Sequence, residues 1–397
     1  MNRFGGAAAV FSTCGCWYTD TEFVLKGLQI MCGIAGFVND MPIDVKCPVL
    51  QRMTDMIAHR GPDSEGHYID EHAALGHRRL SIIDLGGGQQ PIYNEDGSKV
   101  ITFNGEIYNY QTLREELIAA GHTFTTKSDT EVLLHGYEQW GVDLLQRVRG
   151  MFTFVIWDKN KQELFGARDH FGIKPFYYAK MNGTFMYASE IKSLLRHPDF
   201  VKELNAEALK PYMTFQYPAI GETFFKGVYK LPEGHYFTYR DGKMDIHRYY
   251  DEDFREGKQK LGELVNSIDQ TVCDSVKAHQ IADVEVGSFL SSGVDSSYVA
   301  AVARPQHTYS IGFGKGTYNE SQQAGELAEL LKLNNTAESL TDEEAFAAFP
   351  RIQWHLDEPD SNPSCVPLYF LSALAAKDVK VVPSPASVGD ARPRPSA

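Results

Sequence analysis

The stretch Met31-Cys32-Gly33-Ile34-Ala35-Gly36 decides the fold of the first half of the chain. If translation starts at Met31 and that methionine is removed, Cys32 carries a free α-amine. An α-amine has an ordinary pKa of about 8, so it can take the thiol proton near neutral pH. Nucleophile and base then belong to one residue, which is the N-terminal-nucleophile arrangement. The alternative is a small, buried cysteine at the start of a strand, and an isolated Met-Cys-Gly would favour that alternative.

Three later motifs place polar side chains where catalysis could use them. The segment Gly76–Asp84 puts adjacent arginines at the start of an apolar strand. Asn104-Gly105 follows an apolar run, and a side-chain amide with a glycine N–H at a strand end can form an oxyanion hole. Ser128-Asp129-Thr130-Glu131 is typical of a capping box. Taken singly, each motif is more simply explained by solvated arginines, an Asn-Gly turn or a helix cap.

The periodicity predicts two domains of different class. Short strands and interspersed helices before residue 240 predict a layered α+β domain. Expected strands there are Val100–Phe103, Phe152–Trp157, Glu163–Gly166, Phe176–Ala179 and Thr184–Ala188, and expected helices are Thr112–Ala120 and Ser128–Trp140. After a polar stretch, strands alternate with helices, which predicts a parallel α/β sheet. Its expected strands are Val284–Leu290, His307–Phe313 and Val379–Val382, and its expected helices are Leu261–Gln280, Ser296–Ala303, Glu320–Leu331 and Leu368–Ala376.

A serine-rich loop, Ser291–Ser297 (SSGVDSS), joins the expected strand Val284–Leu290 to the helix Ser296–Ala303. Consecutive backbone N–H groups at such a helix start can hold phosphate, helped by hydroxyls and the helix dipole. The loop is not a Walker loop, because no Gly-Lys-Ser/Thr ends it. An ordinary loop with serine caps is the alternative.

Together and in this order, the motifs of residues 32–240 resemble the class II glutamine amidotransferase domain, a four-layered sandwich of the N-terminal-nucleophile type. The resemblance implies that Cys32 attacks the side-chain amide of glutamine. Asn104 and Gly105 would form the oxyanion hole, Arg79 would hold the α-carboxylate and Asp129 the α-amine, which suits their charges. The residues it implies for glutamine binding are Arg79, Leu80, Ser81, Ile82, Ile83, Asn104, Gly105, Glu106 and Asp129.

The loop at Ser291–Ser297 resembles the pyrophosphate-binding S-G-G-x-D-S loop of ATP-pyrophosphatase domains, with Ser292 in place of the first glycine. An amidotransferase domain followed by this loop resembles the glutamine-hydrolysing asparagine synthetases. Supporting segments are Ala167–Pro175, Ala188–Lys192, Lys230–His235, Ser310–Phe313 and Leu356–Pro359. The resemblance implies a C–N ligase that activates aspartate with ATP and Mg²⁺ as an acyl-adenylate, which ammonia then attacks. The implied ATP-binding residues are Leu290, Ser291, Ser292, Gly293, Asp295, Ser296 and Ile311.

The resemblance also predicts domain boundaries. Residues 1–31 are expected to be a removed or non-native extension, 32–240 the amidotransferase domain and 241–258 a linker. Residues 259–382 are expected to be a partial synthetase domain, and 383–397 an aberrant or disordered tail, because the second ATP-binding motif of the family is not found after Val382. On this view the chain hydrolyses glutamine but does not make asparagine.

Composition excludes several other classes of protein. The 397 residues are 43% apolar and carry a net charge of −14, which argues against a nucleic-acid binder and against docking on anionic lipid. No apolar run is long enough to span a membrane. The six cysteines, at positions 14, 16, 32, 47, 273 and 365, form no CxxC pair, so a reducing cytoplasm is expected.

The expected partners are the small molecules glutamine, aspartate and ATP, and the sequence leaves the oligomeric state open, a homodimer included. Three alternatives to the expected function remain. The first is another amidotransferase, such as an amidophosphoribosyltransferase, which the Ser291–Ser297 loop argues against. The second is a related synthetase that amidates a different carboxylate. The third is a non-catalytic binding fragment, which an assay of ammonia release would distinguish.

Overall fold

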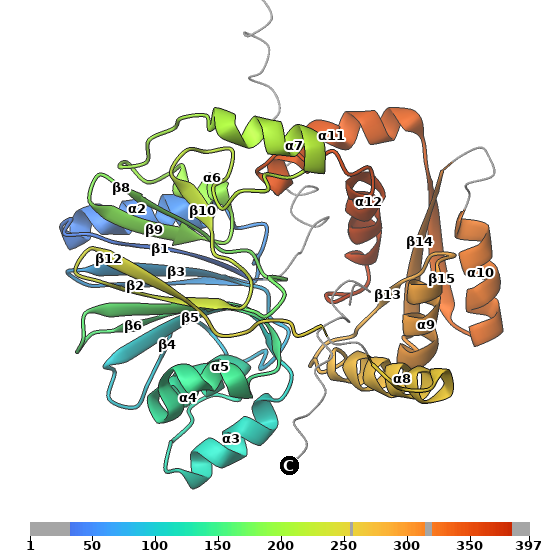
Figure 1. Cartoon of the computed structure of the whole chain (residues 1–397), viewed down its shortest axis with the longest axis horizontal. Coiled ribbons are helices and arrows are strands. Elements are labelled where there is room, and N and C mark those ends of the chain that lie inside the picture. The colour runs from blue at the N-terminus through green and yellow to red at the C-terminus, as the bar shows by residue number, and fades with distance from the viewer. Residues whose placement is uncertain (1–31, 255–256, 314–319, 383–397) are drawn as a thin grey trace, which may run out of the picture.

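The computed structural model describes residues 32–254, 257–313 and 320–382 (Figure 1). Its first half contains two six-stranded antiparallel sheets. The first sheet has the order β10-β8-β9-β1-β3-β2 and comprises β1 (Gly33–Val38), β2 (Ser64–Ile69), β3 (Ala73–Arg79), β8 (Tyr177–Met181), β9 (Thr184–Ala188) and β10 (Val228–Lys230). The second has the order β12-β11-β7-β6-β5-β4 and comprises β4 (Ile92–Tyr93), β5 (Lys99–Ile107), β6 (Gly150–Asp158), β7 (Glu163–Arg168), β11 (His235–Arg240) and β12 (Lys243–Arg248).

The two sheets pack face to face and helices cover both outer faces, so the predicted four-layered sandwich is confirmed (Figure 1). Large side chains such as Trp157, Phe185 and Phe237 fill the space between the sheets. The first sheet is covered by α2 (Ile43–Asp55) and α6 (Ile191–Leu194). The second is covered by α3 (Tyr110–Ala119), α4 (Asp129–Trp140) and α5 (Leu144–Arg147). The remaining short helices are η2 (Gly141–Asp143), η3 (Ala206–Ala208) and α7 (Leu209–Phe215).

Cys32 immediately precedes β1, an inner strand of the first sheet that pairs with β3 on one side and β9 on the other. The small residues of β1 permit this close packing. A Cβ added at Gly36 would come within 2.5 Å of the Ala74 carbonyl oxygen and of the Tyr187 hydroxyl. Glycine is therefore required there, and the sequence around it fixes where Cys32 enters the sandwich.

The linker predicted at residues 241–258 is wrong in its first part, because residues 243–248 form the edge strand β12. Asp241 and Gly242, with φ values of 50° and 73°, turn the chain back so that β12 pairs with β11. An Asp-Gly pair with positive φ at both positions is the strongest short hairpin signal. The charged residues that suggested a linker are typical of a solvent-facing edge strand.

The predicted capping box at Ser128 is only half present. The Ser128 side chain accepts the Thr130 N–H, as a helix cap should. The Glu131 carboxylate instead accepts the backbone N–H and hydroxyl groups of Thr125 and Thr126. It therefore ties down the loop before the helix instead of returning to the Ser128 N–H.

The second half contains a three-stranded parallel sheet of β13 (Ser288–Phe289), β14 (His307–Phe313) and β15 (Asn334–Leu340). Its helices are α8 (Leu261–Ala278), α9 (Val294–Ala303), α10 (Glu320–Leu331), α11 (Asp342–Leu356) and α12 (Cys365–Ala375). Apolar residues of α9 and α10 pack together with Leu290, and α12 packs on Tyr309, so helices flank the sheet on both sides (Figure 1). The predicted parallel α/β sheet of this half is confirmed.

Two predicted strands of this half are shorter in the structure. Only Ser288–Phe289 of the expected strand Val284–Leu290 is a ladder, and Val381 forms a single bridge with Val286. The short ladder suits a strand that enters a polar loop at once, because the residues after Phe289 turn toward α9. The strand β15 and the helix α11 were not predicted. In the described part of the chain, no helix is both long and apolar enough to cross a bilayer.

Candidate active site

Cys32 lies half-buried immediately before β1, where its sulfur contacts the backbone of Leu80. The thiol donates to the Leu80 carbonyl oxygen at 3.6 Å, and the Leu80 N–H donates to Sγ at 3.4 Å. The Arg60 Nε donates to the Cys32 carbonyl oxygen at 3.0 Å, which fixes the backbone. Burial raises the pKa of the Cys32 thiol to about 11, against the lowering effect of the Leu80 N–H and of Arg79. The thiol is therefore protonated at neutral pH and needs a base to become a nucleophile.

A cavity that we call the Cys32 pocket lies beside this thiol, between β3, β5 and the start of α4. The predicted glutamine-binding residues that line it are Arg79, Leu80, Ile82, Ile83, Gly105, Glu106 and Asp129. Ser81 and Asn104 do not line it. Ser81 instead donates its backbone N–H to Asp63 Oδ2 at 2.9 Å. Segments about 100 residues apart in the sequence, from Cys32 to Asp129, thus meet in one cavity.

Arg79 is the last residue of β3, and backbone carbonyl groups of the following loop fix its guanidinium. Its Nη2 donates to the carbonyl oxygens of Ile83 at 3.1 Å and Asp84 at 2.7 Å. Gly88 lies against the same group, since a Cβ there would come within 2.8 Å of Nη2. The loop after β3 therefore positions a cation at the wall of the Cys32 pocket.

Asp129 places a carboxylate in the same pocket from the first residue of α4. Its Oδ2 accepts the Ile107 N–H at 3.0 Å, and its Oδ1 lies 3.4 Å from the Ser128 hydroxyl. Burial raises the pKa of Asp129 to about 6, against these hydrogen bonds. The carboxylate is still ionised at neutral pH, so the pocket offers a cation and an anion on separate walls.

Glu106 and Lys174 form a second buried pair of opposite charge near the pocket. Burial raises the pKa of Glu106, while burial lowers the pKa of Lys174. Each charge partly offsets the effect of burial on the other. Glu106 Oε1 has no hydrogen-bond partner among the described residues. Lys174 belongs to the segment Ala167–Pro175 that supported the resemblance, but the motif alone predicts no role for it.

Asn104 is fully buried within β5, opposite Thr153. Neither Oδ1 nor Nδ2 of its side chain has a hydrogen-bond partner among the described residues. An unpaired buried amide is costly, and Asn104 adjoins Gly105, which lines the Cys32 pocket. The prediction that the strand ends at this residue is wrong, because β5 continues to Ile107 in register with β6.

Sequence reasoning missed further residues that line the Cys32 pocket: Gly88, Gln90, Phe103, Ser128 and Thr130. Gln90 joins two walls of the pocket. Its Oε1 accepts the Phe103 N–H at 2.7 Å, and its Nε2 lies 3.2 Å from the Phe103 carbonyl oxygen and from the Thr130 hydroxyl. The available signal was the glycine run at residues 86–88, which permits the close approach to Arg79.

The loop Ser291–Ser297 lies between β13 and α9, where its hydroxyls bond to one another and to the backbone. Ser291 Oγ lies 2.7 Å from Ser296 Oγ and accepts the Gly293 N–H at 3.2 Å. Ser297 Oγ donates to the Gly293 carbonyl oxygen at 2.7 Å. Ser292 is not among the described residues with positive φ, so serine at this position needs no strained backbone. Ser292, Gly293 and Asp295 are exposed at the helix start.

Leu290 follows β13 directly, and Ile311 lies in the neighbouring parallel strand β14. The Leu290 N–H donates to the Tyr309 carbonyl oxygen at 2.9 Å, and Ser310 Oγ donates to the Leu290 carbonyl oxygen at 2.8 Å. The carboxyl ends of β13 and β14 therefore meet at the loop, which is the edge where open α/β sheets bind ligands. The predicted ATP-binding residues lie together at this edge.

Family comparisons agree with this division of the chain. Residues 31–250 match the family model described as glutamine amidotransferase domain, and residues 267–384 match the one described as asparagine synthase. A putative glutamine-hydrolysing asparagine synthetase 2 of Methanocaldococcus jannaschii is 33% identical over 381 residues, which are 89% of this chain and 73% of the relative. The chain belongs to the glutamine-hydrolysing asparagine synthetase family.

A second relative of this family, the glutamine-hydrolysing asparagine synthetase 1 of Bacillus subtilis, is 43% identical over 359 residues. The match covers 88% of the chain and 57% of the relative, so the chain spans little more than half the length of this protein. Among solved structures, a glutamine phosphoribosylpyrophosphate amidotransferase from B. subtilis, complexed with ADP and GMP, is similar to the chain. The match covers 77% of this chain and 65% of that protein. The two proteins share 15% sequence identity, with a TM-score of 0.42.

Proposed function

We propose that the first half hydrolyses glutamine at Cys32 and that the second half binds ATP for the activation of the side-chain carboxylate of aspartate, the reaction in which ammonia yields asparagine. That this chain performs only the glutamine hydrolysis stays a prediction. The observation that carries the proposal is the placement of the Cys32 thiol beside a pocket with Arg79 and Asp129 in its walls. A free amino acid carries one carboxylate and one ammonium group, and this pocket offers one partner for each.

Binding of glutamine would use the two charged walls. The Arg79 guanidinium pairs with the α-carboxylate, while the ionised Asp129 pairs with the α-ammonium group. Both side chains are fixed by backbone groups before substrate arrives: Arg79 by Ile83 and Asp84, and Asp129 by Ile107. Little side-chain freedom is lost on binding, and the side-chain amide of glutamine is directed toward Cys32.

In the chemical step, the α-amine of Cys32 takes the thiol proton and Sγ attacks the amide carbon of glutamine. The amide oxygen becomes an oxyanion, which the Asn104 Nδ2 and the Gly105 N–H would stabilise. The ammonium group of Cys32 returns the proton to the leaving nitrogen, the C–N bond breaks and ammonia departs. Water then hydrolyses the thioester to release glutamate and restore the thiol.

This mechanism requires that the α-amine of Cys32 be free. Within a peptide bond that nitrogen has no basic lone pair, and the buried thiol would stay protonated. We therefore propose that the active species begins at Cys32. Residues 1–31 lie outside the described residues.

In the second half, the loop Ser291–Ser297 would hold the phosphates of ATP. The exposed N–H groups at the start of α9, together with the serine hydroxyls, suit a polyanion. The exposed Asp295 carboxylate in the first turn of α9 is a hard oxygen donor of the kind Mg²⁺ prefers. Bound there, Mg²⁺ would neutralise phosphate charge. A cytoplasmic location stays a prediction, and the oligomeric state, a homodimer included, stays open.

Ammonia release from glutamine tests the first half of the proposal. In protein that begins at Cys32, Cys32→Ala abolishes release, while Cys47→Ala, at an exposed position of α2, leaves it intact. Equal activity of both variants would refute the nucleophile. For the second half, ATP with Mg²⁺ should slow hydrogen exchange of the amides in the loop Ser291–Ser297. No change in exchange there would argue against the ATP site.

A further inference from the structure

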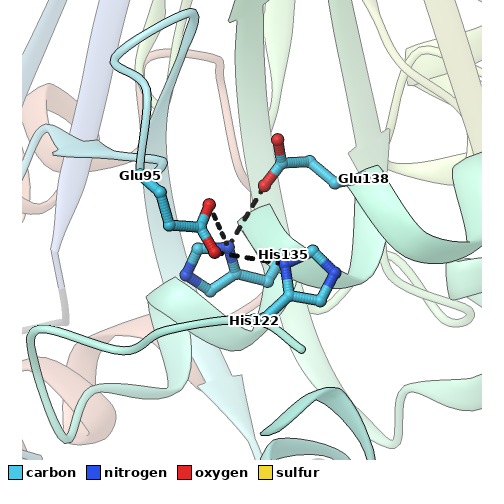
Figure 2. Close-up of side chains that lie close together, drawn as sticks. All are labelled: Glu95, His122, His135 and Glu138. Carbon is cyan, nitrogen blue, oxygen red and sulfur yellow. Dashed lines mark hydrogen bonds and ion pairs between the residues drawn. The ribbon is translucent and has the colours of Figure 1, made fainter. Parts of the chain in front are cut away.

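Four potential metal ligands gather on the helical side of the second sheet, outside the Cys32 pocket (Figure 2). Glu95 lies in the turn between β4 and β5, and His122 lies in the loop after α3. His135 and Glu138 lie three residues apart on one face of α4. Each of the four offers one ligand atom, and these atoms all lie within 4.8 Å of one another.

The separations of these atoms fit a small, four-coordinate ion. The distance from His122 Nδ1 to Glu95 Oε1 is 3.3 Å, and His135 Nδ1 lies 3.4 Å from Glu95 Oε2 and 3.1 Å from Glu138 Oε2. Zinc binds nitrogen and oxygen at about 2.0–2.1 Å, so neighbouring ligands of a tetrahedral site lie about 3.3 Å apart. Charge-assisted hydrogen bonds are usually shorter, at about 2.7–2.9 Å.

Both histidines are oriented as zinc ligands usually are. Each directs Nδ1 toward the cluster, and the opposite nitrogen faces an oxygen of another side chain (Figure 2). His122 Nε2 lies 3.3 Å from Gln139 Oε1, within hydrogen-bond distance. His135 Nε2 lies 3.6 Å from Glu131 Oε1 and has no hydrogen-bond partner among the described residues. An outer partner such as Gln139 fixes the ring and its tautomer in metal sites.

The carboxylates are also held by their outer oxygen or by the backbone. Asn94 Nδ2 donates to Glu138 Oε1 at 2.7 Å, which leaves Glu138 Oε2 directed at His135. Lys99 Nζ lies 3.4 Å from this same Oε1 of Glu138. The Thr123 N–H donates to Glu95 Oε1 at 3.1 Å. The neighbouring carboxylates raise the pKa of His135 to about 9, against the effect of burial, so a bound metal ion would displace a proton from this ring. With both rings neutral, the inner face of the cluster offers acceptor atoms alone.

We propose that Glu95, His122, His135 and Glu138 form a structural zinc site. Two carboxylates balance the charge of Zn²⁺, and two imidazoles supply nitrogen donors, which zinc accepts more readily than Mg²⁺ or Ca²⁺ does. The ion would join the β4–β5 turn and the loop after α3 to α4. Since α4 begins with Asp129, the site fixes the helix that carries one wall of the Cys32 pocket.

Zinc binding should be measured in a Cys32→Ala background, so that the active-site thiol does not bind the ion. Calorimetric titration with zinc chloride, and metal analysis after dialysis, should give one zinc per chain. His122→Asn and Glu95→Gln each remove one ligand at a partly exposed position, and should weaken binding by about tenfold or more. His247→Asn and Glu115→Gln, at exposed positions outside the cluster, should leave binding unchanged.

Thermal unfolding provides the second measurement. Zinc should raise the Tm of the Cys32→Ala protein and of both control variants, and raise it less for the two ligand variants. The visible spectrum of bound Co²⁺ should be that of a tetrahedral site. Absence of zinc binding would show that the cluster is an ion-pair network only. Binding of equal strength in the ligand variants would place the ion elsewhere, and either result would overturn the proposal.

Discussion

Asp283 of the second half holds Asp84 of the first: Asp283 Oδ2 accepts the Asp84 N–H at 2.8 Å. The Asp283 N–H donates in turn to the Ile82 carbonyl oxygen at 3.0 Å. These bonds fix the loop after β3, whose Asp84 carbonyl oxygen anchors the Arg79 guanidinium. The synthetase half therefore braces a wall of the Cys32 pocket.

Removal of this brace should weaken glutamine binding without removing the chemistry. We expect Asp283→Ala to raise the KM for glutamine about two- to tenfold, the effect of losing one hydrogen bond of about 0.5–1.5 kcal/mol. Asp283→Asn, whose amide oxygen still accepts the Asp84 N–H, should restore a KM near that of the parent. Steady-state kinetics measure this, and an unchanged KM in Asp283→Ala would argue against the brace.

Asn104→Ala should lower kcat about 10²–10³-fold, because one donor to the oxyanion is lost. The buried amide has no hydrogen-bond partner among the described residues, so this substitution breaks no side-chain hydrogen bond within them. Asn160→Ala, at an exposed turn position, is the matched control and should retain the parent kcat. A kcat unaffected by Asn104→Ala would rule out the oxyanion role.

Arg79→Ala should act chiefly on KM for glutamine, since the α-carboxylate is held equally in the ground and transition states. The neighbouring Arg78 provides the control. It faces away from the pocket and pairs with Asp55 at 2.5 Å and Glu65 at 2.7 Å. Arg78→Ala should therefore leave KM unchanged. Equal KM effects of the two substitutions would contradict the assignment.

Protonation of Asp129 should weaken glutamine binding at acid pH. Its pKa is raised to about 6, so the carboxylate becomes protonated and loses its charge as the pH falls below that value. The KM for glutamine should consequently rise below pH 6, where the ammonium group loses its partner. Asp129→Asn should raise KM at all pH values and remove this rise, whereas Asp143→Asn, at an exposed position, should keep it. A persistent rise in Asp129→Asn would assign it to another group.

The sequence was most informative where local pattern decides structure. Buried runs such as Phe152–Trp157 and the Asn182-Gly183 turn, with φ values of 50° and 84°, predicted the sandwich strands correctly. The Asp241-Gly242 turn carries the same signal, but the charged residues that follow it suggested a linker and the edge strand β12 was missed.

The candidate site could be predicted only in part, because long-range packing decides the rest. Cys32, Arg79 and Asp129 were identified through their motifs, and they meet in one pocket. Gln90 was missed, because its role depends on Phe103 and Thr130 of other elements, to which it bonds. Glu131 was assigned to a cap by its spacing alone, yet tertiary contacts direct it to the loop at Thr125 and Thr126. Spacing cannot show which of several nearby donors a side chain will meet.

The central claim is that Cys32 acts as nucleophile with its own α-amine as base. The most direct test compares two preparations that differ only at the N-terminus: one begins at Cys32, and the other retains a single blocking residue before it, with intact mass confirming each. We predict ammonia release from glutamine in the first preparation and its loss in the second. Equal release from both would contradict the account, because the base would then have to be another group.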